Sequence, residues 1–242
     1  MNFTVVRAIA TGTLLMGLGM LMVGCAPDKP ETPESTSTIL GHSDIGRSES
    51  DDGKNWNQLK DPAINADTRF AAGQLAESRG QRADALAQYR EALKLNPKHQ
   101  PTLFRMAIVE TEMHQYPQAI QTWKNYVAAT NESAAAWGNL GFCYQVAGKP
   151  SDAEAAYRRG IARDPNEQTC RINYGLMLVA QSRVPEAMEQ FQAVLSPAES
   201  HYNVGSVYEQ LGRKEQAKVE YHTALALDPN FADAQKRLDA LK

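Results

Sequence analysis

Apolar, small and polar residues follow a repeating pattern between residues 66 and 231. A shift of 34 residues superposes the segment 134–167 on its neighbours, so the pattern predicts one structural unit per 34 residues. Within that segment the recurring positions are Trp137, Leu140, Gly141, Tyr144, Gly148, Ala153, Tyr157 and Pro165. Their spacing predicts two helices, 134–147 and 151–163, separated by a turn of Gly, Lys and Pro.

The residue types predict how the two helices of a unit pack together. Small residues at Gly141 and Ala153 allow the helices to approach closely, while rings such as Trp137 and Tyr157 fill the space beside them. Ser151 is the expected N-cap of the second helix. One such pair leaves an apolar face uncovered, so the units are expected to be stable only as a stack.

Five copies of the unit follow one another in the sequence. They occupy residues 66–99, 100–133, 134–167, 168–197 and 198–231. The second copy lacks the glycines and the terminal proline, so its boundary with the third is the least clearly marked. The fourth copy is followed by the next after a step of 30 residues, and Ser196-Pro197-Ala198-Glu199 there predicts a capping box. We therefore expect the second helix of the fourth unit to be about one turn shorter and the last unit to be reoriented.

The third copy resembles the tetratricopeptide repeat, whose pattern is Trp-x2-Leu-Gly-x2-Tyr followed by Ala, an aromatic residue, Ala and Pro. This resemblance covers residues 66–231 and implies an all-α protein: a right-handed α-solenoid of about five helix-turn-helix repeats within residues 62–231. The tail, residues 232–242, has Ala234, Leu238 and Leu241 on one side and is the expected C-terminal capping helix.

The resemblance also implies that the first helices of successive repeats line a concave face. The residues that it places there as a peptide-binding groove are Asn139, Asn173, Asn203, Arg105, Phe104, Phe142 and Tyr202. The three asparagines fall on one stripe, and each amide offers a donor and an acceptor to the backbone of an extended peptide. The aromatic residues and Arg105 are expected to provide specificity. The alternative is that asparagine is simply the family's usual residue at this position and satisfies neighbouring backbone or water.

The N-terminal residues have the pattern of a secretory signal. Arg7 is followed by an uncharged, mostly apolar run from Ala8 to Gly24 and then by Cys25. The sequence LMVGC resembles the bacterial lipobox, which implies a signal peptide over 1–24 and lipidation of Cys25. By the same resemblance, Ala26 favours an outer-membrane lipoprotein facing the periplasm. A plainly cleaved or an uncleaved signal is the alternative.

Composition bounds the remaining possibilities. Residues 25–61 are rich in Pro, Ser, Thr and acidic residues and are expected to be a disordered tether. The formal net charge is −3 and no basic run occurs, so no nucleic-acid partner is expected. The three cysteines form no CxxC pair and the five histidines are scattered, so we expect no catalytic set, metal, cofactor or small-molecule substrate.

The sequence thus predicts a protein that is not an enzyme. It is expected to be a scaffold in the cell envelope, held to the membrane through its lipid anchor, that binds a protein or extended peptide in its concave groove. One alternative is a pilotin-like or envelope-assembly lipoprotein. A more remote one is a non-catalytic subunit of an enzyme complex.

Overall fold

The computed structural model describes residues 64–241, and every element in that range is a helix. The eleven helices are α1 (Ala66–Ser78), α2 (Arg82–Leu95), α3 (Gln100–Glu112), α4 (Tyr116–Ala129), α5 (Ala134–Val146), α6 (Pro150–Arg163), α7 (Gln168–Ala180), α8 (Val184–Gln192), α9 (Pro197–Gln210), α10 (Lys214–Leu227) and α11 (Ala232–Ala240). The predicted all-α class is confirmed. The signal, Cys25 and the tether lie outside the described residues.

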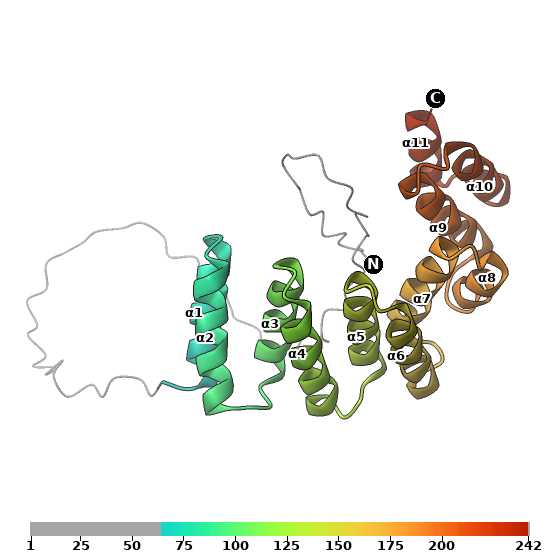
Figure 1. The fold of residues 1–242 in the computed structure, drawn as a ribbon. Helices are drawn as coiled ribbons and strands as arrows, with labels where there is room; N and C mark the ends of the chain where they lie inside the picture. The colour runs from blue at the N-terminus through green and yellow to red at the C-terminus, as the bar shows by residue number, and fades with distance from the viewer. Residues whose placement is uncertain (1–63, 242) are drawn as a thin grey trace, which may run out of the picture.

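The helices form five antiparallel pairs that follow one another along an extended stack, with α11 at the end (Figure 1). Each first helix packs against the second helix of its own pair, and each second helix packs against the first helix of the next pair. In addition, α5 packs directly on α7 and α7 on α9. The described residues therefore form an α-solenoid with a core that continues from pair to pair.

Within four of the pairs, an aromatic ring of the second helix lies directly on a glycine of the first. A Cβ atom added to Gly141 would come within 2.6 Å of the Tyr157 ring, and one added to Gly205 within 2.8 Å of the Tyr221 ring. Both tyrosines are fully buried. The predicted close approach of the helices at Gly141 is confirmed.

One turn differs from what the sequence predicts, and another has a backbone conformation that the sequence analysis left open. The second helix of the third pair begins at Pro150, with Lys149 at the N-cap position, so the expectation that Ser151 caps this helix is wrong. Pro150 fits the first helical position because its missing N–H would have no partner there. Between α4 and α5, where no proline or glycine marks the boundary, Asn131 and Glu132 both take positive φ values of 52° and 57°.

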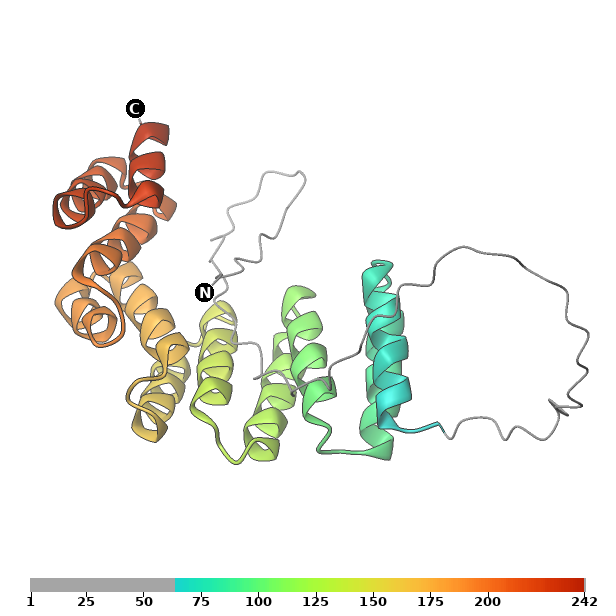
Figure 2. The same cartoon turned by 180° about the vertical axis from the view of Figure 1, so that it is seen from behind.

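The fourth pair is shortened as expected. α8 has 9 residues, whereas the other second helices have 14. Ser196 and Glu199 form the expected capping box at the start of α9: the Ser196 N–H donates to the Glu199 carboxylate at 2.8 Å, and the Glu199 N–H donates back to the Ser196 hydroxyl at 3.2 Å. Figure 2 shows that α7 and α9 are inclined to the nearly parallel axes of α1–α5.

The last helix covers the end of the stack. Ala234 and Leu238 of α11 are buried, and Leu238 packs in a cluster with Tyr221 of α10. Within residues 64–241 no helix is both long enough and apolar enough to span a bilayer.

Candidate functional site

The three asparagines of the predicted stripe lie on α5, α7 and α9, the helices that pack directly on one another. Asn139 and Asn173 are buried, with 8% and 4% of their surface exposed. Asn203 is more exposed, but its amide donates to the carbonyl of Glu199 at 2.8 Å, one turn back on the same helix. The structure therefore places two buried asparagines on the directly packed helices α5 and α7 and turns the third onto its own helix.

The amide atoms of Asn139 and Asn173 are still reachable. No side-chain hydrogen bond to either amide occurs among residues 64–241. Among residues 64–241, Nε of Arg237 is the one fully buried side-chain nitrogen or oxygen atom without a hydrogen bond. This atom is ion-paired with Glu209. The unpaired amide atoms of both asparagines must therefore have some surface accessible to water or to a ligand.

Arg105 is occupied within the protein. Its guanidinium forms an ion pair with Glu77 of α1, with Nε donating to the carboxylate at 3.3 Å. The Tyr89 hydroxyl of α2 donates to the same carboxylate at 2.5 Å. These contacts join the first and second pairs, and a role of Arg105 toward a ligand stays a prediction.

The same arrangement recurs at the other end of the array, where the sequence analysis did not identify it. Arg237 of α11 is ion-paired with Glu209 of α9 at 3.3 Å, and the Tyr221 hydroxyl donates to Glu209 at 2.7 Å. Arg237 occupies the place in α11 that Arg105 occupies in α3. The first and last repeats have Glu and Tyr at the same repeat positions, and the helix that follows each repeat has Arg at the same position. This recurrence in the sequence was the signal that could have revealed both junctions.

Two of the three predicted groove aromatics are packed against other rings. Phe104 contacts Trp123 edge-on with ring centroids 5.6 Å apart. Tyr202 lies 5.6 Å from Tyr221 and 5.1 Å from Phe231. Phe142 is partly exposed, and its ring has no aromatic neighbour in the described part of the chain. Asn139, Asn173 and Phe142 are therefore the members of the predicted set without a hydrogen-bond or aromatic partner among residues 64–241.

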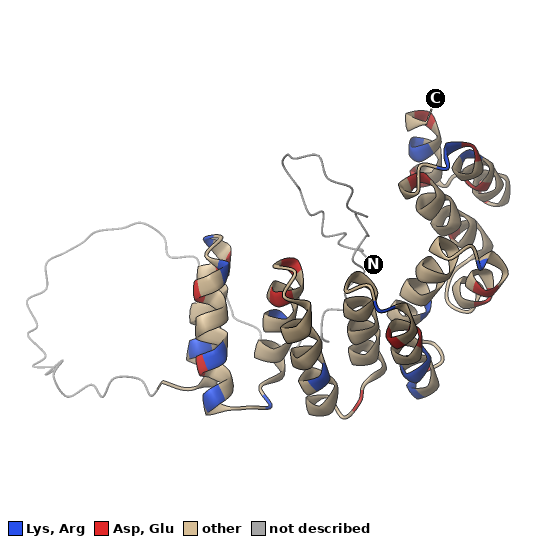
Figure 3. Ribbon diagram, viewed as in Figure 1, with Lys and Arg blue, Asp and Glu red and all other residues tan. Residues whose placement is uncertain are grey.

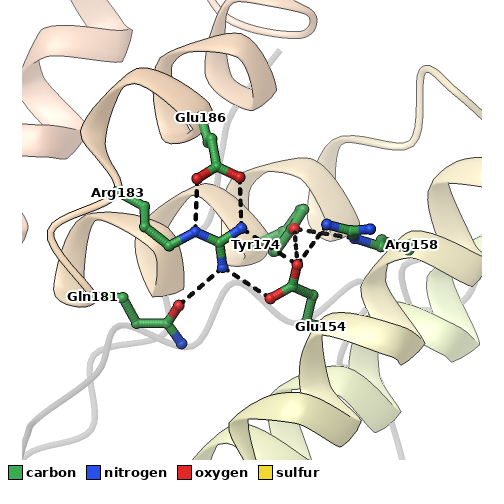
Figure 4. Close-up of polar contacts among 6 residues, drawn as sticks. All are labelled: Glu154, Arg158, Tyr174, Gln181, Arg183 and Glu186. Carbon is green, nitrogen blue, oxygen red and sulfur yellow. Dashed lines mark hydrogen bonds and ion pairs between the residues drawn. The ribbon is translucent and has the colours of Figure 1, made fainter.

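A polar network that the sequence analysis missed joins the third and fourth pairs (Figure 4). The carboxylate of Glu154 on α6 accepts hydrogen bonds from Arg183 at 2.9 Å, from the Tyr174 hydroxyl at 2.7 Å and from Arg158 at 2.6 Å. Arg183, at the start of α8, also donates to the carboxylate of Glu186 at 2.7 Å. One arginine thus fastens the short helix α8 to α6.

These contacts change the titration of Glu154. Hydrogen bonds from Arg183, with further contributions from Tyr174 and from the charge of Arg158, lower the pKa of the Glu154 carboxyl to about 2, although partial burial opposes the change. The Glu154 carboxylate is therefore ionised at neutral and mildly acidic pH.

A polar pocket of about 380 Å³ lies beside this network between α6, α7 and α8. Both arginines of its lining already have partners: Arg158 is ion-paired with Glu154 at 2.6 Å, and Arg171 donates to the side-chain carbonyl of Gln190 at 2.9 Å. Such a pocket offers a ligand few unused hydrogen-bonding groups.

The described residues contain no cluster of three or more His, Cys, Asp or Glu side chains that could hold a metal ion. Cys143 and Cys170 are buried and are not joined by a disulfide, and the Cys170 thiol donates to the carbonyl of Ala134 at 3.1 Å. Burial raises the pKa of the Cys143 thiol to about 11, so at neutral pH it is protonated and a poor nucleophile.

Comparison with known families identifies the repeated unit. Models described as tetratricopeptide repeat match residues 134–167, 198–231 and 66–99. These three segments match the tetratricopeptide repeat, and one further helix pair lies between each of them and the next. We refer to residues 64–241, which contain the three segments, as the tetratricopeptide array.

Related proteins are similar to this array over a small part of their own length. The general transcriptional corepressor ssn6 of Schizosaccharomyces pombe is 24% identical over 169 residues, which are 70% of this chain and 13% of that protein. The Hsp70-Hsp90 organising protein of Plasmodium falciparum is 27% identical over 151 residues, 59% of this chain and 26% of that protein. The chain thus spans about a quarter or less of these two relatives.

Solved structures share the fold. The crystal structure of YrrB matches with a TM-score of 0.50 at 23% identity and covers 72% of this chain and 91% of YrrB. That of MamA matches with a TM-score of 0.55 at 21% identity and covers 69% of this chain and 94% of MamA.

The Glu154 network yields a stability prediction with a defined pH dependence. Replacing Glu154 by Gln should lower the free energy of unfolding at pH 7 by about 1–2 kcal/mol, because two arginines lose a charged acceptor. A carboxyl whose pKa is lowered by folding stabilises the fold above its unfolded pKa and loses that effect as the pH falls through about 2. Urea unfolding at several pH values should therefore show a difference from wild type that disappears toward pH 2.

Glu215→Gln serves as the matched control. Glu215 pairs with Lys218 at 2.9 Å, but its side chain is 85% exposed, so its removal should change stability little. Equal losses in the two variants would contradict a special role for the Glu154 network.

Proposed function

We propose that this protein is a membrane-anchored, extracytoplasmic scaffold whose tetratricopeptide array binds a protein or an extended peptide. The observation that carries the proposal is the pair of reachable amides, Asn139 and Asn173, on directly packed first helices. Phe142, partly exposed on α5, adds an apolar surface beside them. We propose a binding role and no catalytic one.

The chemistry of the two amides fits an extended peptide. Each amide can accept from a peptide N–H and donate to a peptide C=O, whatever the peptide's side chains. A net contribution of about 0.5–1.5 kcal/mol per hydrogen bond gives modest affinity with little sequence preference. Contact with Phe142 would then add preference for an apolar side chain in the ligand.

The relatives support a binding role in general terms. YrrB is described as a TPR protein with an unusual peptide-binding site, and the Plasmodium falciparum relative is named as an organising protein for Hsp70 and Hsp90. These two descriptions support our proposal that the array of this chain binds a polypeptide. That this chain binds a polypeptide partner and lies in the cell envelope are both parts of our proposal.

We further propose that Cys25 carries the membrane anchor. The support is the sequence alone: Arg7, the apolar run to Gly24 and the lipobox-like LMVGC. Acyl chains on Cys25 would hold the array at the outer membrane, facing the periplasm, through the segment 25–61. Each buried methylene group adds about 0.8 kcal/mol to such anchoring.

The amide pair can be tested with peptides selected on the wild-type protein. Twelve-residue peptides are selected from a displayed library on residues 26–242, and their affinities for Asn139→Ala/Asn173→Ala are measured by calorimetry. Loss of two hydrogen bonds, one per amide, should weaken binding by about 1–3 kcal/mol, or roughly 5- to 150-fold.

Asn203→Ala is the matched control, because the Asn203 amide already bonds to the carbonyl of Glu199. It should leave the affinity within about twofold of wild type. Full binding by the double variant, with its melting temperature unchanged, would exclude the amide pair as the ligand contact.

The anchor can be tested by metabolic labelling in a bacterial host with an alkyne analogue of palmitate. The wild-type chain should incorporate the label and sediment with membranes, and Cys25→Ala should lose both properties. Cys143→Ala should keep both, since Cys143 is a buried residue of the array. Labelling of the Cys25→Ala chain at the wild-type level would refute the anchor.

A further inference from the structure

An apolar pocket of about 340 Å³ lies on another part of the array, between the second helices α4 and α6 with α5 as its floor. Its lining comprises Lys124, Val127, Ala128, Glu132, Trp137, Leu140, Tyr144 and Arg159. A smaller hollow of about 180 Å³ continues from it and shares Trp137, Tyr144 and Arg159. We call this combined surface the outer pocket.

The outer pocket and the asparagine pair occupy opposite sides of α5. At about 100° of rotation per residue, the directions of Trp137, Leu140 and Tyr144 cluster on one side of the helix. By the same geometry, Phe142 points about 170° and Asn139 about 130° away from the mean direction of that cluster. A ligand in the outer pocket would therefore leave the asparagine face free.

The floor of the outer pocket is apolar and its rim is cationic. α5 carries no charged residue and is tan throughout in Figure 3. The neighbouring helices α4 and α6 both carry Lys or Arg positions, drawn in blue. The Arg159 guanidinium lies over the Trp137 ring, 5.0 Å from its centroid. Lys124 and Arg159 are both exposed, and neither has an acidic partner within residues 64–241.

The acidic residues at the outer pocket do not neutralise this rim. Glu132 is ion-paired with Arg163 at 2.9 Å, and Arg163 is not part of the lining. Asp152 lines the smaller hollow, at the beginning of α6. The outer pocket therefore has one unpaired acidic residue, Asp152, and two unpaired cations, Lys124 and Arg159, which flank its floor.

The equivalent pocket one repeat further along has a different character. There Arg171 and Tyr174 replace Trp137 and Leu140 in the floor, and Arg158, at the place of Lys124, is paired with Glu154. The apolar floor with unpaired cations is therefore a property of the α4–α6 position and does not follow from the repeat as such.

We propose that the outer pocket binds an acidic peptide segment that carries a bulky apolar side chain. The apolar side chain would enter between α4 and α6 and cover Leu140 and Trp137. Carboxylates on either side of it would pair with Lys124 and Arg159, where partial desolvation by the ligand strengthens the attraction. The array then has two ligand surfaces on opposite sides of α5, and this second surface does not depend on the asparagine pair.

The test uses the full chain, purified in non-ionic detergent, and a fluorescein-labelled probe of sequence Asp-Glu-Phe-Leu-Glu-Asp. Fluorescence anisotropy should show saturable binding that weakens as salt is raised, because the rim charges are exposed. A probe with Lys at the four acidic places, and one with Ser-Ser in place of Phe-Leu, should each bind at least about tenfold more weakly.

Charge reversal locates the site. Lys124→Glu/Arg159→Glu should weaken binding of the acidic probe by at least about tenfold. Lys98→Glu/Lys236→Glu changes the net charge equally at two exposed positions outside the pocket and should stay within about twofold of wild type. Circular dichroism of both variants checks that the helices are intact.

The outcomes separate this proposal from the asparagine face. Asn139→Ala/Asn173→Ala should bind the acidic probe like wild type, and loss of binding in that variant would place the probe on the asparagine face instead. The proposal is overturned as well by unchanged affinity in Lys124→Glu/Arg159→Glu, by equal binding of the Lys probe, or by no binding of the acidic probe at about millimolar concentration.

Discussion

In four of the five helix pairs of the described residues, an aromatic ring of the second helix lies on a glycine of the first, and this contact sets the geometry of most of the array. Gly141 and Tyr157 illustrate the contact, with room for a hydrogen but not for a methyl group between helix and ring. Because the ring replaces the side chain that a larger residue would carry, the two helix axes come close and the pair behaves as one block. Stacked blocks then place equivalent positions of the first helices in a row, which makes a stripe such as Asn139 and Asn173 possible.

The junctions between blocks are not alike. At the two ends, an arginine of the following helix pairs with a glutamate that also receives a tyrosine hydroxyl: Arg105 with Glu77, and Arg237 with Glu209. At the α5–α7 junction the equivalent place is taken by Asn173, whose amide makes no such contact within residues 64–241. At the two ends of the array, the polar side chains at this position are therefore paired within the protein, whereas in the middle the Asn173 amide is not. The outer pocket lies on the other side of α5 in the same middle region.

The sequence predicted what depends on local chemistry and on the period of the repeat. The helix pairs, the shortened α8 and the Ser196–Glu199 capping box all follow from neighbouring residues, and all are observed. Contacts between units were harder to predict, because a shift of register by one turn changes every partner. The ion pair of Arg105 with Glu77 of the preceding unit could therefore not be predicted from the sequence. The exposure of an asparagine also depends on how closely neighbouring helices pack, so the near-burial of Asn139 and Asn173 could not be foreseen.

The buried carboxyl group of Glu110 is another feature that could not be predicted from the sequence. Glu110 is 1% exposed and accepts a hydrogen bond from the Thr122 hydroxyl at 2.7 Å, and burial raises its pKa. The pattern of the other repeats, which have Tyr144 or Leu178 at this place, gives no reason to expect an acid there. A pair of helices can accommodate such a residue when one hydroxyl of the facing helix lies opposite it.

The stability of Gly141→Ala, measured by urea unfolding, tests the central claim most directly, because two effects predict opposite signs. Alanine is the better helix former by about 0.8–1.0 kcal/mol, so propensity alone would stabilise the variant. A methyl group 2.6 Å from the fully buried Tyr157 ring forces the helices apart, which should lower the free energy of unfolding by about 1–3 kcal/mol. A loss of stability is the predicted result, and a gain would contradict the claim that ring-on-glycine contacts set the spacing of the array.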